Sequence, residues 1–314
     1  MARILFRESA ERVPLLGNLG WWLEARMLAL FWYWVTRTDV ERASRRGYRL
    51  FHWLGPRLRK NHHVLSNLQV AFADMSAQRR LTLAKQVWGN FGAVLAEYPF
   101  LPELVRMGPG SRTDISVSEA SSRIIRNRQP AVYVTAHSGN WEIGTFIMTS
   151  LKIPVTTVYS PQSNPFVDRM LQSFRETPGL KFIPAKNAMR QLVRELREGR
   201  SVGMLPDQRN DGGDPVPYFG VKAPTITSPA WLAVTMNCPL IPVEVERIGE
   251  ARFRAVFHDP VDSFAEITDK KQRVLAITGE LNTCFESWIR KHPQHWHCTK
   301  RRWPSGVPSG VSFS

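Results

Sequence analysis

The segment VYVTAHSGNWEIG, residues 132–144, decides the fold that this chain can adopt. It opens with an apolar, β-branched run that predicts a buried strand, and the apolar spacing after Asn140 predicts a helix. Asn140 is a favourable N-cap, Glu142 falls in the first helical turn, and Gly139 permits a tight turn between the two elements. His137 is therefore expected at the carboxyl end of a strand, where open α/β sheets place their sites, beside the positive end of a helix dipole.

His137 and Glu142 have the residue types of a general base and its partner. We expect Glu142 to fold back to one ring nitrogen of His137, leaving the other nitrogen free to accept a proton from a hydroxyl. No serine or cysteine lies in a G-x-S-x-G turn, so the nucleophile would be the substrate's own hydroxyl, as in direct acyl transfer to an alcohol. The alternative is a surface His–Glu pair without catalytic function. A zinc site is disfavoured because the chain has no H-E-x-x-H pattern here.

Short β-rich runs alternate with helical patterns through most of the chain. The predicted strands cover 113–117, 131–136, 154–159, 201–205 and 240–246. The predicted helices cover 118–128, 140–151, 165–176, 187–199 and 226–237, and a long amphipathic pattern follows at 268–291. Strands alternating with helices of this length predict an α/β fold with a mostly parallel central sheet flanked by helices.

The N-terminal region has a different character. Its aromatic side chains are Trp21, Trp22, Phe31, Trp32, Tyr33 and Trp34. The uninterrupted apolar run at 27–35 is shorter than the roughly 20 residues that span a bilayer. Arginines follow it, and such a pattern is typical of a helix lying on an anionic leaflet, with an aromatic core helix beside a solvated basic helix as the alternative. We expect 1–60 to form a helical membrane-association region, 61–303 the catalytic domain and 304–314 a flexible tail.

Composition restricts the partners. The chain has 314 residues, 43% of them hydrophobic, and a formal net charge of +15 from 42 basic and 27 acidic side chains. The hydrophobic content excludes a disordered protein, and the charge indicates an anionic partner, meaning nucleic acid, an anionic membrane or a phosphorylated substrate. A basic surface without such a partner is the alternative. The three cysteines form no C-x-x-C pair, which disfavours a disulfide framework and suits a reducing, cytosol-facing environment.

Several blocks of the sequence resemble one family. AHSGNWE (136–142) is similar to the signature of the lysophospholipid acyltransferase superfamily, a His followed after four residues by Asp or Glu. Its Gly-Asn-Trp-Glu form resembles the late lipid A acyltransferases (lauroyl and myristoyl transferases), whose branch includes enzymes that acylate mannosylated phosphatidylinositol. Further blocks resemble this family in the same order: SPQSNPFVDRMLQSFR (160–175), GMLPDQRNDGGDPVPYFG (203–220), CPLIPVEVER (238–247) and HPQHWHCTKRRWP (292–304). The resemblance covers most of the chain and implies a glycerol-3-phosphate acyltransferase-like fold.

The first two blocks imply roles for four residues. By resemblance, His137 is the base and Glu142 is its partner. The family places arginines after the second strand to bind a substrate phosphate, and Arg169 and Arg175 occupy that region. Arginine suits bidentate phosphate binding, although a solvated helix face is the alternative for each of them.

The later blocks imply further substrate contacts. Asp207, and with it Gln208, would orient the site or bind a polar head group, with an ordinary strand-end turn as the alternative. Residues 218–220 would line an acyl channel, or else form core aromatics under a loop. Arg301 and Arg302 would meet phosphate or anionic lipid, or else belong to a solvated basic tail.

Two departures from the family pattern lie in these contact regions. Ser160 stands where the family commonly has an arginine before proline, and the terminal block reads Thr-Lys-Arg-Arg at 299–302 instead of His-Arg-Arg. They bear on which glycolipid is acylated more than on acyl transfer itself.

Residues and resemblance together predict a membrane-associated O-acyltransferase at the cytoplasmic face of the cell inner membrane. It would move a fatty acyl chain from acyl carrier protein or acyl-coenzyme A to a hydroxyl of a lipid A precursor, in lipopolysaccharide biosynthesis. No cofactor, metal or nucleic-acid partner is implied. An acceptor such as phosphatidylinositol mannoside or another polar lipid is the alternative. A non-catalytic membrane or nucleic-acid-binding protein is more remote, since no helix-turn-helix, zinc or RNA-binding signature is present.

Overall fold

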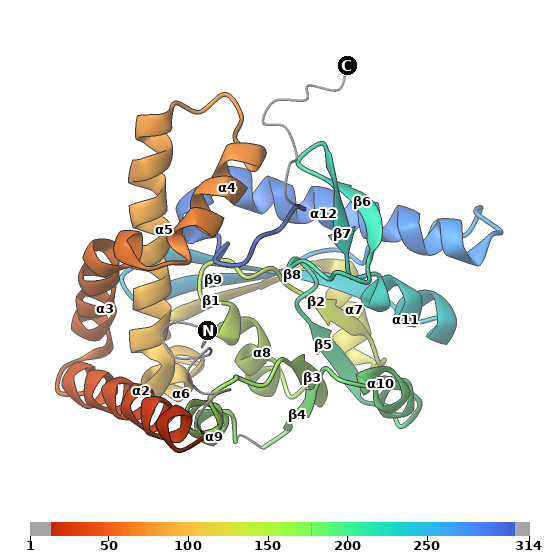
Figure 1. The fold of residues 1–314 in the computed structure, drawn as a ribbon. Helices are drawn as coiled ribbons and strands as arrows, with labels where there is room; N and C mark the ends of the chain where they lie inside the picture. Colours follow the sequence, from red (N-terminus) through yellow and green to blue (C-terminus); the bar gives the residue numbers. More distant parts are fainter. Residues whose placement is uncertain (1–13, 177, 305–314) are drawn as a thin grey trace.

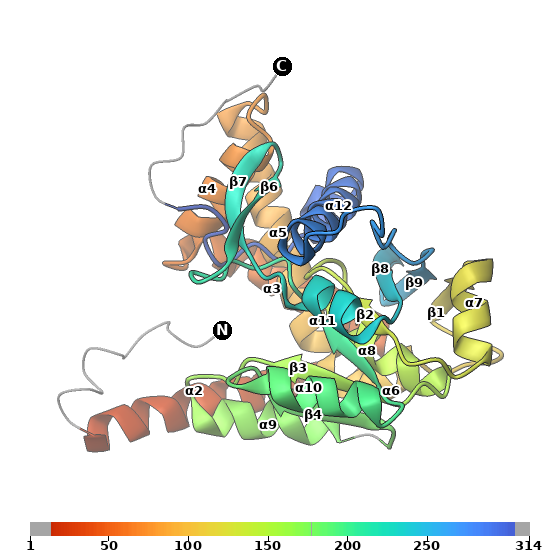
Figure 2. The same ribbon diagram turned by 90° about the vertical axis from the view of Figure 1, so that its right-hand side faces the viewer.

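The computed structural model describes residues 14–176 and 178–304, and at 14–17 it describes only the course of the helix. A seven-stranded sheet with the order β1-β9-β8-β2-β5-β3-β4 forms its centre (Figures 1 and 2). Its strands are β1 (Thr113–Val117), β2 (Val132–Val134), β3 (Val155–Tyr159), β4 (Leu180–Pro184), β5 (Ser201–Met204), β8 (Leu240–Gly249) and β9 (Arg252–Phe257). Within this sheet only β8 and β9 pair antiparallel, so the predicted mostly parallel sheet is confirmed.

Helices surround the sheet on both faces and at one end. Those that alternate with the strands are α7 (Glu119–Arg126), α8 (Trp141–Ser150), α9 (Pro165–Arg175), α10 (Ala188–Arg197), α11 (Ser228–Met236) and α12 (Lys270–Lys291). The N-terminal layer consists of α2 (Pro14–Val35), α3 (Val40–Leu54), α4 (Asn61–Ala71), α5 (Ala77–Glu97) and α6 (Leu101–Leu104). Short 3-10 turns are η1 (Gly55–Arg57), η2 (Tyr98–Phe100) and η3 (Pro293–His295), and a separate hairpin pairs β6 (Asp214–Tyr218) with β7 (Val221–Thr225).

Two hydrophobic cores cover the two faces of the sheet. Val132 and Val134 of β2 pack into one core with residues of α5, α10, α11 and α12. Tyr133, between them, packs into the other core with residues of α2, α6, α8 and α9. The alternation of side chains along a strand produces this division. Because β2 is buried on both faces, its end is a rigid place for the residues that follow it.

The N-terminal helices pack against the sheet domain. A Cβ on Gly47 of α3 would lie 2.2 Å from the main-chain oxygen of Gly92 on α5, so these helices touch through their backbones. Trp32 of α2 donates its indole N–H to the main-chain oxygen of Leu95 at 2.8 Å. In the described ranges, no helix combines the length and the apolar character that crossing a membrane requires.

Candidate active site

The turn between β2 and α8, residues 135–140, carries His137, and we call it the His137 turn. Gly139 has a φ of +58°, and a Cβ on it would lie 2.4 Å from the main-chain oxygen of Val245 on β8, so only glycine fits there. Asn140 caps α8, because its side-chain oxygen accepts the main-chain N–H of the second helical residue at 3.2 Å. The predicted strand, turn and capped helix are thus confirmed.

Asp207 is the carboxylate that contacts the ring of His137. Its Oδ1 lies 2.6 Å from Nδ1 of His137, and its Oδ2 accepts the main-chain N–H of His137 at 3.0 Å. The Asp207 side chain is 1% exposed and the His137 side chain 18%. A carboxylate only accepts hydrogen bonds, so Nδ1 carries the hydrogen and Nε2 has the lone pair. The arrangement can therefore take a proton from a hydroxyl at Nε2.

Glu142 faces a different partner from the one expected. Its Oε1 lies 2.8 Å from an Nη of Arg175, at the end of α9, and the two side chains are 7% and 13% exposed. Burial, and next the charge of Glu142, raise the pKa of the Tyr98 hydroxyl well above its usual value. The expectation that Glu142 holds the ring of His137 therefore differs from the structure, in which Asp207 occupies Nδ1. The sequence spacing could not show which carboxylate contacts His137, because Asp207 reaches it from the turn that follows the neighbouring strand β5.

A buried carboxylate behind the His137 turn joins three elements. Glu97, at the end of α5, is 0% exposed and accepts two hydrogen bonds from the guanidinium of Arg247, at 2.6 and 2.8 Å. It also accepts the hydroxyl of Ser44 at 2.6 Å and the side-chain amide of Asn140 at 2.8 Å. The cap of α8 is thus tied to α3, α5 and β8 by a connected polar network.

Asn90 extends this network to the main chain of the turn. Its amide donates to the main-chain oxygens of Gly139, at 3.0 Å, and of His295, at 3.3 Å, and its oxygen accepts Nε of Arg247 at 3.0 Å. Sequence reasoning missed Asn90, Glu97 and Arg247. The sequence does indicate two of them, because Asn90 and Glu97 are polar residues among the apolar residues on the buried part of α5.

An aromatic stack closes one side of His137. The ring of Trp141 lies 5.6 Å from that of His137 and 4.9 Å from that of His297, and Phe91 lies 5.0 Å from His297. The main-chain N–H of His297 donates to the main-chain oxygen of His137 at 2.7 Å. Burial lowers the pKa of His297 well below its usual value, so this imidazole is neutral. The C-terminal block therefore packs directly against His137.

The remaining predicted substrate residues lie in different settings. Arg169 is exposed, with its guanidinium over the ring of Phe166 at 5.1 Å. Gln208 and Arg301 are half-buried. Arg302 is 2% exposed and donates to the main-chain oxygen of Pro224 and to the hydroxyl of a neighbouring threonine, both at 2.8 Å. Its expected contact with substrate therefore differs from the structure, where it joins the C-terminal segment to the β6–β7 hairpin.

The aromatic pair expected to line an acyl channel lies in the core. Tyr218 is 0% exposed and Phe219 is 7% exposed. Phe219 stacks on Trp296 with ring centroids 5.9 Å apart, and Tyr218 lies beside Trp303 at 5.9 Å. This is the alternative of core aromatics under a loop. Among the described residues, no group of three or more His, Cys, Asp or Glu side chains is placed to hold a metal ion.

Comparison with known proteins identifies the family. The family model described as bacterial lipid A biosynthesis acyltransferase matches residues 13–305. The chain belongs to this family. It is an acyltransferase, and the predicted resemblance is confirmed.

Curated relatives of this acyltransferase have low sequence identity. The phosphatidylinositol mannoside acyltransferase of Mycolicibacterium smegmatis is 25% identical over 178 residues, which span 55% of this chain and 56% of that relative. The lipid A biosynthesis palmitoleoyltransferase of Escherichia coli is 21% identical over 291 residues, which span 90% of this chain and 91% of the relative. A crystal structure of a 1-acyl-sn-glycerophosphate acyltransferase from Thermotoga maritima matches with a TM-score of 0.35 and 14% identity, over 85% of this chain and 98% of that one.

Family membership relates the contact between His137 and Asp207 to the chemistry of acyl transfer. An acyltransferase without a serine or cysteine nucleophile needs a base for the acceptor hydroxyl, and Nε2 of His137 is the free nitrogen beside a buried carboxylate. The N-terminus of α8 begins directly after the His137 turn, and its N–H groups favour developing negative charge nearby.

Proposed function

We propose that this acyltransferase moves a fatty acyl chain from a thioester, carried by acyl carrier protein or coenzyme A, to a hydroxyl of a lipid A precursor. The proposal rests on one observation above all, the 2.6 Å contact between Nδ1 of His137 and Oδ1 of Asp207. This contact gives a half-buried, oriented imidazole within a family of lipid acyltransferases.

The reaction follows from the orientation of His137. Nε2 takes the proton of the acceptor hydroxyl, whose oxygen attacks the thioester carbonyl carbon. The positive end of the α8 dipole stabilises the oxyanion that forms. The C–S bond then breaks, and the leaving thiolate takes the proton from the imidazolium. Asp207 keeps its charge throughout and stabilises the imidazolium.

Glu142 and Arg175 support this site as a pair. The Glu142 carboxylate compensates the charge of Arg175, so that neither ion is buried alone. Nε of Arg175 is buried and has no hydrogen-bond partner among the described residues, so a phosphate oxygen would satisfy this donor if the neighbouring side chains moved aside to admit it. We therefore retain Arg175, rather than the outward-facing Arg169, as the phosphate contact.

The exposed face of α2 supports the proposed location at an anionic membrane surface. Its outward apolar side chains are Leu19, Trp22, Leu23, Met27, Leu30, Tyr33 and Trp34. Arginines lie over the aromatic members, for instance Arg26 over Trp22 at 5.0 Å and Arg46 over Trp34 at 5.3 Å. Apolar and aromatic groups flanked by cations suit the interface of a leaflet with anionic lipids. We propose the cytoplasmic face of the inner membrane.

Phosphatidylinositol mannoside is a second candidate acceptor. The relative of that name has the higher identity, 25% against 21%, although its match covers less of this chain. Both acceptors combine sugar hydroxyls with phosphate, so in either case His137 would remove a proton from a sugar hydroxyl.

The experiment is acyl transfer by the purified full-length protein. The donor is a palmitoyl thioester of acyl carrier protein or of coenzyme A, and the acceptor is either a lipid A precursor or a phosphatidylinositol mannoside. Mass spectrometry measures the masses of the lipid products. We expect one added acyl chain on the lipid A precursor and a loss of about 10²–10⁴-fold in rate for His137→Ala. Exchange of the exposed His62 for alanine is the matched control. Unmodified lipids in every reaction, or full activity of the His137 variant, would refute the proposal.

A further inference from the structure

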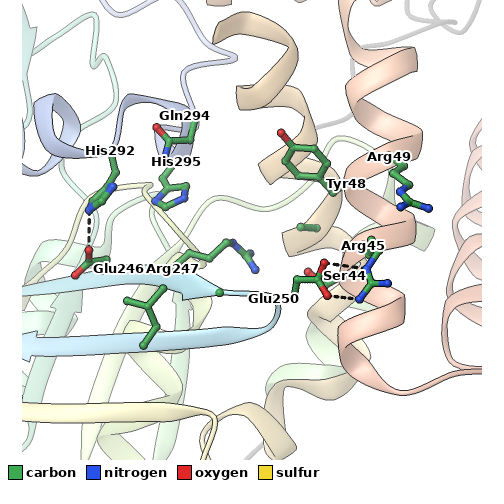
Figure 3. Close-up of a pocket in the computed structure, with 13 residues that line it drawn as sticks. Ser44, Arg45, Tyr48, Arg49, Glu246, Arg247, Glu250, His292, Gln294 and His295 are labelled. Carbon is green, nitrogen blue, oxygen red and sulfur yellow. Dashed lines mark hydrogen bonds and ion pairs between the residues drawn. The ribbon is translucent and has the colours of Figure 1, made fainter. Parts of the chain in front are cut away.

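A cavity of about 960 Å³ lies on the other side of the His137 turn, between α3, α5, the β8–β9 turn and η3 (Figure 3). It is lined by none of His137, Glu142, Arg175 and Asp207. Sites for small ligands have volumes of about 300–1,000 Å³. The cavity, which we call the α3 cleft, is therefore large enough for a ligand of its own.

An ion pair and a contact between a histidine and a carboxylate fix polar groups on opposite sides of the α3 cleft. Arg45 on α3 pairs with both carboxylate oxygens of Glu250, on the β8–β9 turn, with Nε at 2.8 Å from one of them. On the other side, Nε2 of His292 lies 2.6 Å from Glu246. Paired groups like these present hydrogen-bond donors and acceptors with little net charge, which suits a ligand that is rich in hydroxyl groups more than a strong polyanion.

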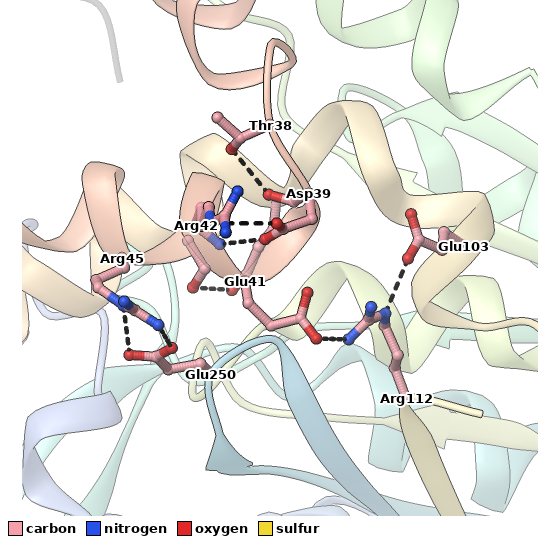
Figure 4. A network of polar contacts seen from close by, with 10 residues as sticks. Thr38, Asp39, Glu41, Arg42, Arg45, Glu103, Arg112 and Glu250 are labelled. Atoms are coloured by element: carbon pink, nitrogen blue, oxygen red, sulfur yellow. Dashed lines mark hydrogen bonds and ion pairs between the residues drawn. The ribbon is translucent and has the colours of Figure 1, made fainter. Parts of the chain in front are cut away.

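Further ion pairs hold α3, and with it the rim of the α3 cleft. Figure 4 shows Arg112, next to β1, between Glu41 of α3 and Glu103 of α6, with Nε of Arg112 2.8 Å from the latter. In the same view, Arg45 reaches Glu250 one turn further along the helix. The rim is thus attached to the sheet at two places and is preorganised for binding.

Tyr48 supplies a flat apolar wall. A Cβ on Gly89 of α5 would lie 2.6 Å from Cε2 and Cζ of Tyr48, so one edge of the ring rests on the backbone of that helix, while the residue is 36% exposed. It also stacks on His52, at 5.7 Å between ring centroids. Gln294 stands on the facing wall in Figure 3, and neither it nor the hydroxyl of Tyr48 forms a side-chain hydrogen bond with another residue that the structure describes.

We propose that the α3 cleft binds a saccharide, namely a sugar of the acceptor head group other than the one that is acylated. A pyranose has an apolar C–H face for the ring of Tyr48 and hydroxyl groups that both donate and accept. A nucleobase presents its polar atoms in the plane of its ring, whereas the polar groups here stand on walls around the ring of Tyr48. The assignment to an acceptor rests on the proposed function, while sugar binding by itself does not.

The position of the α3 cleft connects it with both the membrane face and the base. Arg46 of α3 stacks on Trp34, in the exposed face of α2, so a lipid head group in the leaflet lies close to the rim. Arg247 and His295 line the cleft and also hold the His137 turn, through Asn90 and through the Gly139 N–H, which donates to the His295 oxygen at 3.2 Å. Binding free energy from a remote sugar can thus be used to position the reacting hydroxyl.

The first experiment measures binding without acyl transfer. Full-length protein in detergent micelles is titrated by calorimetry and saturation-transfer NMR with diacetylchitobiose, α-mannobiose, inorganic phosphate and adenosine monophosphate. We expect saturable binding of at least one disaccharide, weakened about tenfold by Tyr48→Ala, as for the loss of one aromatic contact. Trp53→Ala, which removes an exposed ring from the same helix outside the cleft, should change nothing. No disaccharide binding, equal binding by Tyr48→Ala, or displacement of the sugar by phosphate or nucleotide would each overturn the proposal.

The second experiment separates this inference from the proposed function. It compares kcat/KM of wild-type protein and Tyr48→Ala on the complete glycolipid and on an acceptor cut down to the acylated sugar. We expect the variant to lose activity only on the complete acceptor, because the removed ring and the removed sugar act on the same contact. Equal losses on both acceptors would overturn the assignment to the acceptor. A protein that binds the disaccharide but acylates neither glycolipid would refute the proposed function and leave the sugar site standing.

Discussion

At the scale of single residues, the proton route depends on which nitrogen of His137 carries hydrogen. Asp207 accepts from both Nδ1 and the main-chain N–H of His137, so it fixes the ring and its tautomer together. Asp207→Asn keeps the shape but can donate to Nδ1, which would place the hydrogen on Nε2 and remove the base. We expect kcat to fall by about 10³–10⁴-fold, with little change in KM. Steady-state kinetics with acyl thioester and glycolipid measures this.

The control for Asp207 is Glu142, the carboxylate five residues after His137. Glu142→Gln should act mainly on stability, because it leaves Arg175 buried without its countercharge. If Glu142→Gln abolishes turnover in a fully folded protein while Asp207→Asn stays active, the base is held by Glu142 in the working enzyme and the assignment to Asp207 is wrong.

Residues close together in the sequence were the predictable part of the site. The strand end at His137, the glycine turn and the cap at Asn140 follow from local backbone rules. The contact between His137 and Asp207 spans 70 positions, and only the pairing of β2 with β5 brings them together. Local rules name both residues as strand-end side chains but contain no information on which carboxylate reaches the ring.

At the scale of elements, α5, α8 and β8 meet at Glu97. Because this carboxylate is 0% exposed and holds the guanidinium of Arg247, which is 12% exposed, Glu97→Gln would leave a largely covered cation without its countercharge. We expect the free energy of unfolding to fall by about 3–5 kcal/mol, the usual cost of breaking a buried ion pair. Chemical denaturation monitored by tryptophan fluorescence measures this change.

Glu103→Gln is the matched control, since Glu103 also pairs with an arginine but its side chain is 41% exposed. It should cost less than about 1 kcal/mol. Similar losses from the two substitutions would mean that the network at Glu97 does not hold the His137 turn any more firmly than a surface pair would.

The elements that sequence patterns missed share a physical cause. The predicted strands and helices of the alternating region are confirmed, with bounds that differ by a few residues. β6 and β7 were missed because prolines, which disfavour strands, occur in both, and Pro215 lies opposite Pro224 in the ladder. β9 was missed although it alternates exposed and buried residues; it lies between β1, to which it is parallel, and β8, to which it is antiparallel. β4, the edge strand that pairs with β3, was missed as well. The periodicity of a short segment cannot predict that it will pair with another strand that lies elsewhere in the sequence.

The exposed face of α2 provides a test of membrane association. Met27 and Leu30 are 67% and 66% exposed, so Met27→Asp with Leu30→Asp should leave the fold intact. Each side chain that enters a leaflet contributes roughly 1.5–3 kcal/mol, so the double variant should bind anionic vesicles more than tenfold less. Sedimentation with phosphatidylglycerol vesicles measures this. Leu81→Asp, an exposed leucine of α5, is the control, and if it weakens binding equally, the contact surface lies outside α2.

At the scale of the whole molecule, the N-terminal helices are structurally continuous with the sheet domain. Ala25, Trp32 and Val35 of α2 are buried in the same core as residues of β3 and β8. The side-chain amide of Asn164, the cap of α9, donates to the main-chain oxygen of Trp21 at 2.8 Å. Deleting α2 would therefore remove core packing as well as an exposed apolar face. Substitutions on its exposed face are thus the better probe of membrane association.

The fold as a whole should lose stability in weak acid. Burial, together with the charges of Arg247 and His292, lowers the pKa of His295 to about 3, against a usual value of 6.5. Burial lowers the pKa of His297 as well. Both histidines are neutral in the folded chain, and in the unfolded chain they bind protons below about pH 6.5. Their contribution to stability is therefore complete above that pH and falls as the pH decreases, by up to about 1.4 kcal/mol per unit for each histidine.

Unfolding by urea at pH 7.0, 6.0 and 5.0 measures this dependence. His295→Gln keeps a hydrogen-bonding side chain of similar size but cannot be protonated, so its stability should change less steeply with pH than that of the wild-type chain. The difference in slope should approach about 1.4 kcal/mol per unit between pH 6 and 5, because a single proton is involved. His62→Gln, at an exposed position of α4, should keep the wild-type slope. If the His295 variant also keeps that slope, then His295 takes up its proton without unfolding, and the wall it shares between the α3 cleft and the His137 turn opens to water in the native state.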